Sequence, residues 1–233
     1  MKRSFLRLAA AILLVLPFAA ACEKDDRDRG EFLISYGEIA DGSPGYSIRL
    51  DNGIILEIIE NRIPYASIKV GQRVIADYKL AGGRIQVNDS TFKYLIVLND
   101  LYNVLSKPAL YSGNVNTPAQ QDSIGNDRSE VVDAWISSKY FNINFNIFRN
   151  NPNLIHMVNL VVDEQNSTSD KIYLKFRHNA KGDAQIYRTF GRVSFDISPI
   201  ISILERGKQV KFILSWDGLH NNTPTREIRF TRK

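Results

Sequence analysis

Apolar and polar residues alternate with a period of two along most of the chain. Residues 140–148 read Tyr-Phe-Asn-Ile-Asn-Phe-Asn-Ile-Phe, so the apolar side chains fall on one face and three asparagines on the other. Residues 171–177, 193–197 and 210–216 repeat the pattern. Such alternation is typical of antiparallel strands with one buried and one solvated face. The sequence therefore predicts an all-β protein.

Turn signals separate these runs, and helix signals are scarce. Asp51-Asn52-Gly53, Gly82-Gly83 and Asp217-Gly218 lie where hairpin turns need positive φ angles. The best helix signal is in residues 99–105, where Asp100 is expected to cap one or two turns that end before Pro108.

Residues 111–127 predict a linker, because they are polar, contain Gly and Pro and have no periodicity. Before them, residues 31–110 hold about five or six short strands and fit a small barrel. After them, residues 128–233 hold about seven strands and fit a sandwich. Trp135 and Trp216 are predicted to be core anchors of the sandwich.

The N-terminus has the pattern of a lipoprotein signal peptide. Cations in residues 2–7 precede an apolar run, Leu8 to Ala21, that is too short to span a bilayer permanently. The run ends in three alanines before Cys22, the only cysteine of the chain. We expect residues 1–21 to be cleaved, lipid to anchor Cys22 to a membrane, and the charged residues 22–30 to form a solvated tether. The alternative is an ordinary internal thiol.

The step Lys24-Asp25-Asp26 resembles the acidic export signal of surface lipoproteins in the Bacteroidetes. This resemblance implies an outer-membrane lipoprotein on the cell surface, and a spacer facing the periplasm is the alternative. The formal net charge of +5 includes three signal-peptide cations, so the mature chain is only weakly basic. We therefore expect no nucleic-acid partner.

Several stretches resemble the NigD-like family of Bacteroidetes lipoproteins. They are Glu60-Asn61-Arg62, Gly71-Gln72-Arg73-Val74, residues 99–108, residues 122–127, Val132-Asp133-Ala134-Trp135-Ile136, residues 174–183 and residues 193–196. The resemblance covers nearly the whole mature chain and implies an OB-like barrel followed by a β-sandwich, which we expect to be Ig-like. It supplies no catalytic residues, and the run Ile54 to Ile59 leaves the register of that strand open.

Motifs for catalysis are missing from the sequence. The three histidines, His156, His178 and His220, lie on or near separate strands without a zinc-binding spacing. We find no nucleophile elbow, P-loop or dinucleotide motif. The sequence therefore predicts neither an enzyme, a metal site nor a cofactor, although loops of a β-scaffold can assemble a site that one sequence does not reveal.

Two groups of residues are candidates for contact with a ligand or partner. Arg177-His178-Asn179 follow the strand at residue 174, and a turn with Asn179 in left-handed backbone is the alternative. Asn142 and Asn144 belong to an amide row like those on sugar-binding faces, and a plain solvated sheet face is the alternative.

Ser123 and Ser90 are candidates for O-glycosylation, because Asp122-Ser123-Ile124 and Asp89-Ser90-Thr91 resemble the short sequon of Bacteroidetes proteins.

Three functions follow from these observations. The first is a lipid-anchored binding or adaptor module for a protein or glycan partner. The second is a bacteriocin-associated accessory or immunity factor, as the operon context of the family implies. The third is an envelope hydrolase whose site the sequence does not reveal.

Overall fold

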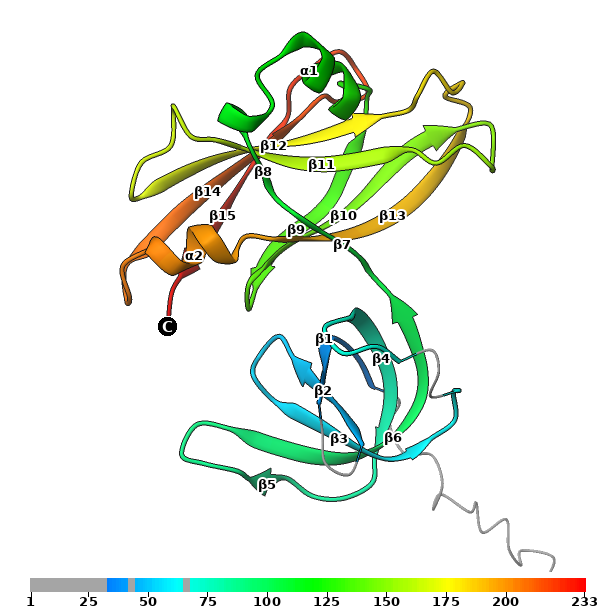
Figure 1. Ribbon diagram of the computed structural model, residues 1–233, viewed down its shortest axis with the longest axis vertical. Helices are drawn as coiled ribbons and strands as arrows, with labels where there is room; N and C mark the ends of the chain where they lie inside the picture. Colours follow the sequence, from blue (N-terminus) through cyan, green and yellow to red (C-terminus); the bar gives the residue numbers. More distant parts are fainter. Residues whose placement is uncertain (1–32, 42–44, 65–67) are drawn as a thin grey trace, which may run out of the picture. The chain divides into compact units, whose positions relative to one another are not determined.

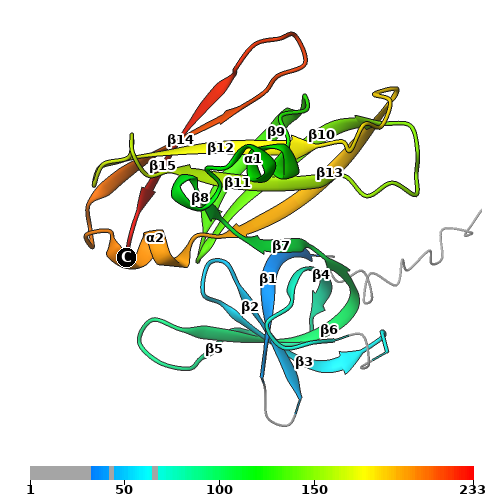
Figure 2. The same ribbon diagram turned by 45° about the horizontal axis from the view of Figure 1, so that its top comes forward.

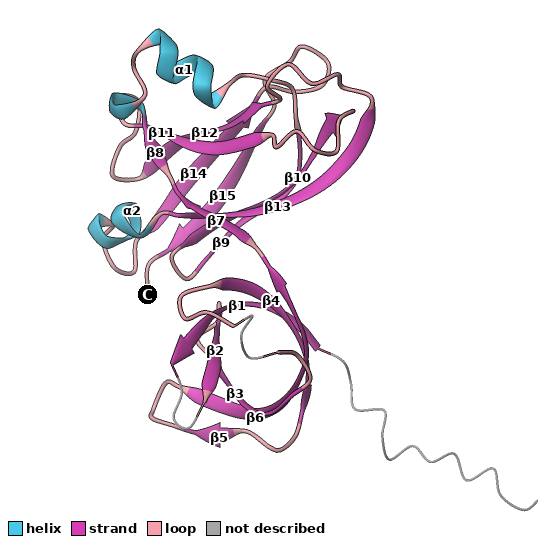
Figure 3. Cartoon of the chain, turned by 45° about the vertical axis from the view of Figure 1, so that its right-hand side comes forward, coloured by secondary structure: helices cyan, strands magenta, loops and turns pink. Residues whose placement is uncertain are grey.

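A computed structural model of the chain describes residues 33–41, 45–64 and 68–233. The predicted signal peptide, Cys22 and the predicted tether lie outside these residues. The fold is mostly β: strands form three sheets, with two short helices beside them (Figures 1 and 3). The predicted all-β class, a barrel followed by a sandwich, is confirmed.

The first sheet closes into a barrel. Its strands are β1 (Leu33–Asp41), β2 (Tyr46–Leu50), β3 (Ile55–Asn61), β4 (Arg73–Leu80), β5 (Ile85–Gln86) and β6 (Phe92–Asn103). The order β3-β2-β1-β4-β6 is closed by a parallel pairing of β3 with β6, which is the connectivity of an OB-fold. Inside lie apolar side chains from all five strands: Ile39, Ile48, Leu50, Leu56, Val74, Ala76, Tyr78, Ile96 and Leu98, with Ile68 from a loop.

The helix predicted at residues 99–105 is wrong, because β6 continues to Asn103. The ladder between β4 and β6 pairs Tyr78 with Leu98 and Asp77 with Asp100, so Asn99 is an extra residue. This β-bulge shifts the alternation by one place. Leu98 and Leu101 therefore both contact the barrel core, and their spacing of three imitates a helix.

Two further sheets form the sandwich (Figure 2). The strands are β7 (Leu105–Pro108), β8 (Leu110–Tyr111), β9 (Glu130–Ser137), β10 (Tyr140–Arg149), β11 (Met157–Asp163), β12 (Lys171–Asn179), β13 (Tyr187–Asp196), β14 (Gln209–Trp216) and β15 (Thr225–Thr231). One sheet has the order β7-β13-β10-β9 and the other β15-β14-β12-β11-β8. The apolar rows predicted from the alternation lie between the sheets; the row from β10, for example, is fully buried.

Strand direction differs from the expectation of antiparallel pairing. β7 with β13, β8 with β11 and β12 with β14 are parallel pairs. Alternation reports which face of a strand is buried and not the direction of its neighbour, so the prediction had no basis for distinguishing the two.

The chain passes from the barrel into the sandwich with one residue between strands. β6 ends at Asn103, β7 begins at Leu105, and Val104 between them is buried. β7 and β8 pair with sandwich strands, so the sandwich begins at β7, before the boundary predicted at residue 110. The predicted linker holds a 3-10 turn (Ser112–Asn114) and α1 (Pro118–Ile124), which Thr117 caps through a capping box with Gln120.

The other helix, α2 (Ser198–Ile203), follows β13 and buries Ile200 in the sandwich core. Trp216 lies in this core, as predicted. Trp135 does not: its ring packs edge-to-face on Tyr36 of the barrel, with ring centroids 5.3 Å apart. Within residues 33–41, 45–64 and 68–233, no helix has the length and apolar character needed to cross a bilayer.

Gly191 of β13 tests how closely the sandwich core is packed. A Cβ at this position would collide with the ring of Phe145, which lies opposite on β10. We expect Gly191→Ala to lower the free energy of unfolding by about 1–3 kcal/mol, as overpacked cores do. Gly83→Ala is the matched control, since nothing lies within 4 Å of its Cβ position. Equal urea midpoints for the two variants would contradict this account of the core.

Candidate functional site

A buried polar cluster joins the barrel to the sandwich. At its centre the Arg73 side chain is fully buried, with 0% of its surface exposed. Its guanidinium donates to both carboxylate oxygens of Asp51, at 2.5 and 2.7 Å. Arg73 begins β4 and Asp51 follows β2, so the ion pair lies within the barrel. Two parallel hydrogen bonds of this kind fix the orientation of both groups.

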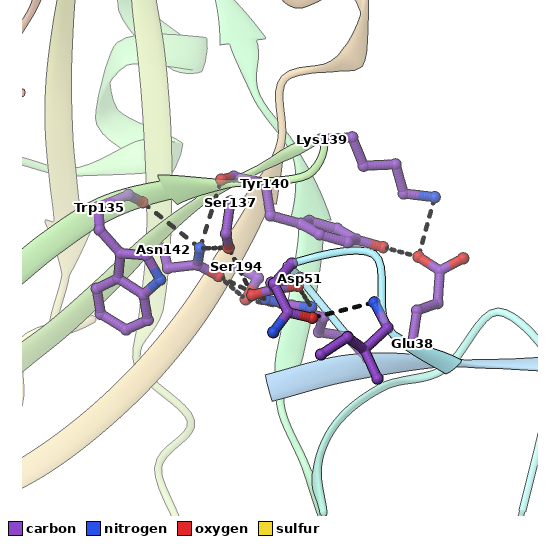
Figure 4. Close-up of polar contacts among 11 residues, drawn as sticks. Glu38, Asp51, Trp135, Ser137, Lys139, Tyr140, Asn142 and Ser194 are labelled. Carbon is purple, nitrogen blue, oxygen red and sulfur yellow. Dashed lines mark hydrogen bonds and ion pairs between the residues drawn. The ribbon is translucent and has the colours of Figure 1, made fainter. Parts of the chain in front are cut away.

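The remaining contacts of Arg73 cross to the sandwich. Its Nε donates to Ser194 Oγ at 3.3 Å, and its Nη2 donates to Asn142 Oδ1 at 3.0 Å. Ser194 and Asn142 bond to each other at 2.7 Å. Ser137 connects the two domains again, because its hydroxyl donates to Asp51 at 2.5 Å and accepts from Asn142 at 2.8 Å (Figure 4). A single arrangement of the two domains therefore satisfies the Arg73–Asp51 ion pair and three neutral side chains together.

Aromatic rings and a second ion pair surround this cluster. Arg73 lies 4.5 Å from the ring centroid of Tyr140 and 5.4 Å from that of Tyr36. Figure 4 shows the Tyr140 hydroxyl and the Lys139 ammonium converging on Glu38, at 2.5 and 3.0 Å. Burial raises the pKa of Tyr140, and its hydrogen bond to Glu38 raises it further. The phenol therefore stays protonated and holds the β9–β10 hairpin against the barrel.

A cleft of about 320 Å³ opens beside these residues. Its carboxylates are Glu38 and Asp51, and each is already bonded to cations or hydroxyls of the cluster. A general acid and base need free carboxyl groups aimed at a substrate. As it stands, the cleft has the chemistry of a structural junction.

A second buried cluster lies in the sandwich and contains two of the three histidines. His156 Nδ1 is 2.9 Å from His178 Nε2, and its Nε2 is 3.0 Å from Asp183 Oδ2. His178 Nδ1 is 3.1 Å from the carbonyl oxygen of Arg128. Asp183 also accepts backbone N–H groups from residues 150 and 151. The cluster thereby connects the β10–β11 loop to the β12–β13 loop.

The hydrogen bonds of this cluster determine which nitrogen of His178 donates and which accepts. Burial lowers the pKa of His178, so its ring is neutral near pH 7 and its Nδ1–H donates to the carbonyl of Arg128. Nε2 of His178 is then the acceptor of the hydrogen bond with His156 Nδ1. The backbone N–H of Asn150 lowers the pKa of Asp183, which is an acceptor only. His156 therefore lies between the acceptor nitrogen of His178 and the carboxylate of Asp183.

The predicted contact residues Arg177 and Asn179 hold α1 in place. Arg177 is buried and donates to Gly125 O, Gln121 O and Gln121 Oε1. Asn179 Nδ2 donates to two carbonyls at the end of α1. The left-handed backbone of the following turn falls on Lys181 and Gly182 and not on Asn179. A partner does not reach Arg177 while α1 stays in place, and His178 is buried against His156 and Arg128.

The other predicted site residues are placed as follows. Asn142 is buried in the junction cluster, whereas Asn144 is half-buried and its Oδ1 has no hydrogen-bond partner among the described residues. Ser123 and Ser90 are exposed, and their glycosylation stays a prediction. His220 lies in the β14–β15 loop, apart from the other two histidines.

Sequence reasoning missed Arg73, Asp51 and Asp183 as members of clusters. The available signal was that Arg73 and Asp183 lie in family-like stretches, Gly71-Gln72-Arg73-Val74 and residues 174–183. In the part of the chain that the structure describes, no group of three or more His, Cys, Asp or Glu side chains is arranged to hold a metal ion.

Known structures share this architecture. A protein described as toxin-related from Parabacteroides distasonis is 22% identical, with a TM-score of 0.67 over 87% of this chain and 95% of that chain. A protein of unknown function from Bacteroides vulgatus is 26% identical, with a TM-score of 0.65 over 85% and 90%. A NigD-like immunity protein from Bacteroides caccae is 16% identical, with a TM-score of 0.61 over 88% and 98%. No curated protein matches the sequence.

Fold and polar clusters together define a two-domain β-protein in which a barrel is bonded to a sandwich through buried polar groups. The family model of the NigD-like C-terminal beta sandwich domain matches residues 114–230. The chain therefore belongs to the NigD-like family, and the predicted resemblance is confirmed.

Arg73→Met tests the junction. Removing the buried guanidinium leaves Asp51, whose side chain is 17% exposed, without its cation, and breaking a buried pair costs about 3–5 kcal/mol. We expect that loss in urea unfolding followed by tryptophan fluorescence, for which Trp135 is a reporter at the junction.

Arg49→Met is the matched control for this variant, because Arg49 lines the same cleft but is exposed. A change below about 0.5 kcal/mol is expected for such a surface position. Equal losses in both variants would show that the buried network does not hold the junction.

The histidine cluster predicts a dependence of stability on pH. The lowered pKa of His178 means that the unfolded chain binds a proton below about pH 6.5 that the folded chain does not. The free energy of unfolding should therefore fall as the pH drops below 6.5, by at most about 1.4 kcal/mol per pH unit for one proton.

His178→Asn keeps a donor for the carbonyl of Arg128 and removes the titration, so its unfolding free energy should fall less between pH 6.5 and 5. His220→Gln should keep the wild-type slope, since His220 is exposed. Identical slopes in urea titrations of all three proteins would refute the assignment.

Proposed function

We propose that the chain is a lipid-anchored protein of the cell envelope that binds a protein or glycan partner and catalyses no reaction. The anchor is lipid on Cys22, and residues 22–30 act as a tether. The membrane is the outer membrane, and the folded domains face the cell surface.

One observation carries the binding part of this proposal. Arg73, His156 and His178 are engaged in buried polar clusters, whereas large apolar side chains stay exposed on β13 and just before it. The exposed fractions are 56% for Ile186, 65% for Tyr187 and 46% for Phe190. Neighbouring apolar residues exposed in this way favour a contact surface.

The lipid anchor in this proposal rests on the sequence. A lone cysteine directly after Ala19-Ala20-Ala21 has no disulfide partner in the chain. Two or three acyl chains, each gaining about 0.8 kcal/mol per buried methylene, hold a protein on a membrane almost permanently. The acidic step Lys24-Asp25-Asp26 supports export to the surface.

An immunity role is the second candidate. It is favoured by the shared fold with the NigD-like immunity protein of Bacteroides caccae. An immunity protein acts by binding, so this candidate differs from the first in its partner and not in its chemistry. Deletion of the gene without any change in bacteriocin sensitivity would remove it.

Cys22→Ser tests the anchor in cells of the native host. The wild-type protein should be recovered with the outer membrane, and the variant should move to the soluble fraction, because it has no thiol to acylate. Ser123→Ala is the matched control and should stay in the membrane. Membrane recovery of the Cys22→Ser protein equal to wild type would contradict lipid anchoring.

Two further measurements test orientation and binding. Protease added to intact cells should digest the wild-type protein while a periplasmic marker survives. Crosslinking in intact cells, followed by purification through a C-terminal tag, should return the same protein or glycan in repeated preparations. Absence of any reproducible crosslink would count against the binding function.

A further inference from the structure

The outer side of β13 is open along six residues. β13 pairs with β10 from Tyr187 to Asp196, but on its other side β7 covers only Val193 to Asp196. No described residue pairs with Tyr187–Arg192 on that side. Figures 1 and 2 show this part of β13 at the margin of its sheet.

The hydrogen-bond pattern identifies which backbone groups face outward. Ile197 donates to Lys139 on the β10 side, whereas the carbonyl of Asp196 accepts from Ala109 on the β7 side. The backbone N–H and C=O groups of successive strand residues point to opposite sides. Those of every second residue counted back from Asp196 therefore point away from β10. These are Arg188, Phe190 and Arg192.

The other outer strands of the sandwich are β7, β8, β9 and β15. β7 has four residues and β8 has two. β9 is bridged to β15, because Arg226 donates to Asp133 Oδ1 and to the carbonyl of Val132. Natural edges are usually blunted by short length, charged side chains, proline or bulges, and of these β13 has only the charges of Arg188 and Arg192. The register of β13 on β10 is unbroken, and residues 187–192 contain no proline.

The side chains of the same three residues define what fits this edge. Arg188, Phe190 and Arg192 share the outer face of the sheet and are exposed. Arg188 contacts Glu130 at 2.7 Å in an exposed ion pair, which contributes little and leaves the guanidinium accessible. The edge therefore presents Arg188, the ring of Phe190 and Arg192 at every second residue, and the Arg192 guanidinium lies over the Phe190 ring, 4.6 Å from its centroid.

We propose that residues 187–192 of β13 accept an extended acidic segment of a partner protein as an additional strand. The segment carries Asp or Glu, an apolar residue, and Asp or Glu at alternate positions, opposite Arg188, Phe190 and Arg192. This inference rests on the proposed binding function and specifies its partner.

Charge selects this occupant over a second copy of the chain. An antiparallel pair of two β13 edges would bring arginines of both copies together, and like charges opposite each other destabilise a sheet. An acidic strand turns the same positions into favourable cross-strand pairs and gains backbone hydrogen bonds along the edge.

The experiment uses a capped peptide, Thr-Glu-Thr-Val-Thr-Glu-Thr, and the purified Cys22→Ser protein without its signal peptide. At millimolar peptide, amide exchange measured by NMR should slow at Arg188, Phe190 and Arg192. Residues 189 and 191 should change little, because they are already bonded to β10. The peptide with Lys in place of Glu should bind at least tenfold more weakly.

Two variants at one position separate the contribution of the backbone N–H to peptide binding from that of the side chain. Phe190→Pro removes an outward N–H and should weaken peptide binding at least tenfold relative to Phe190→Ala, which keeps it. Arg188→Glu combined with Arg192→Glu leaves the backbone intact and should reverse the preference toward the lysine peptide. This double variant tests the proposal even if the proline variant does not fold.

Three results would overturn the inference: no alternating protection with the acidic peptide, equal binding by Phe190→Pro and Phe190→Ala, or equal binding of both peptides. If the crosslinked partner of the native protein proves to be a glycan, this inference fails while the proposed binding function stands.

Discussion

The buried guanidinium of Arg73 is the constraint on which the arrangement of the two domains depends. A charge removed from water is costly unless ionic and neutral partners surround it. Here Asp51 comes from the barrel, whereas Asn142 and Ser194 come from the sandwich. Because these acceptors are complete only when the domains meet in one orientation, the cost of burying the charge becomes a penalty on every other orientation.

The histidine cluster applies the same principle inside the sandwich. His156, bonded to both His178 and Asp183, connects two loops, and Arg177 holds α1 through backbone carbonyls. Residues of types common in active sites are thus engaged in architecture. In this protein a perturbed pKa and a buried ionisable group indicate packing of irregular segments that have few apolar side chains to bury.

Alternation in the sequence was enough to predict the strands and the apolar core, because burial on one face leaves a period of two in residues such as those of β10. It failed at Asn99, where a bulge changes the phase, and it carried no information on strand direction. Arg73 was invisible for another reason. Its partners lie 22, 69 and 121 residues away, and only the folded chain brings them together.

The near absence of connecting residues between β6 and β7 has a consequence for dissecting the molecule. The family-model match to the sandwich begins at residue 114, after β7 and β8. A fragment excised there would lose the strands that cover β11 and the end of β13, so the open margin of β13 would lengthen from six residues to ten. The folded sandwich is therefore larger than the region that the family model matches. Isolating only the matched region would expose strand edges that are prone to self-association.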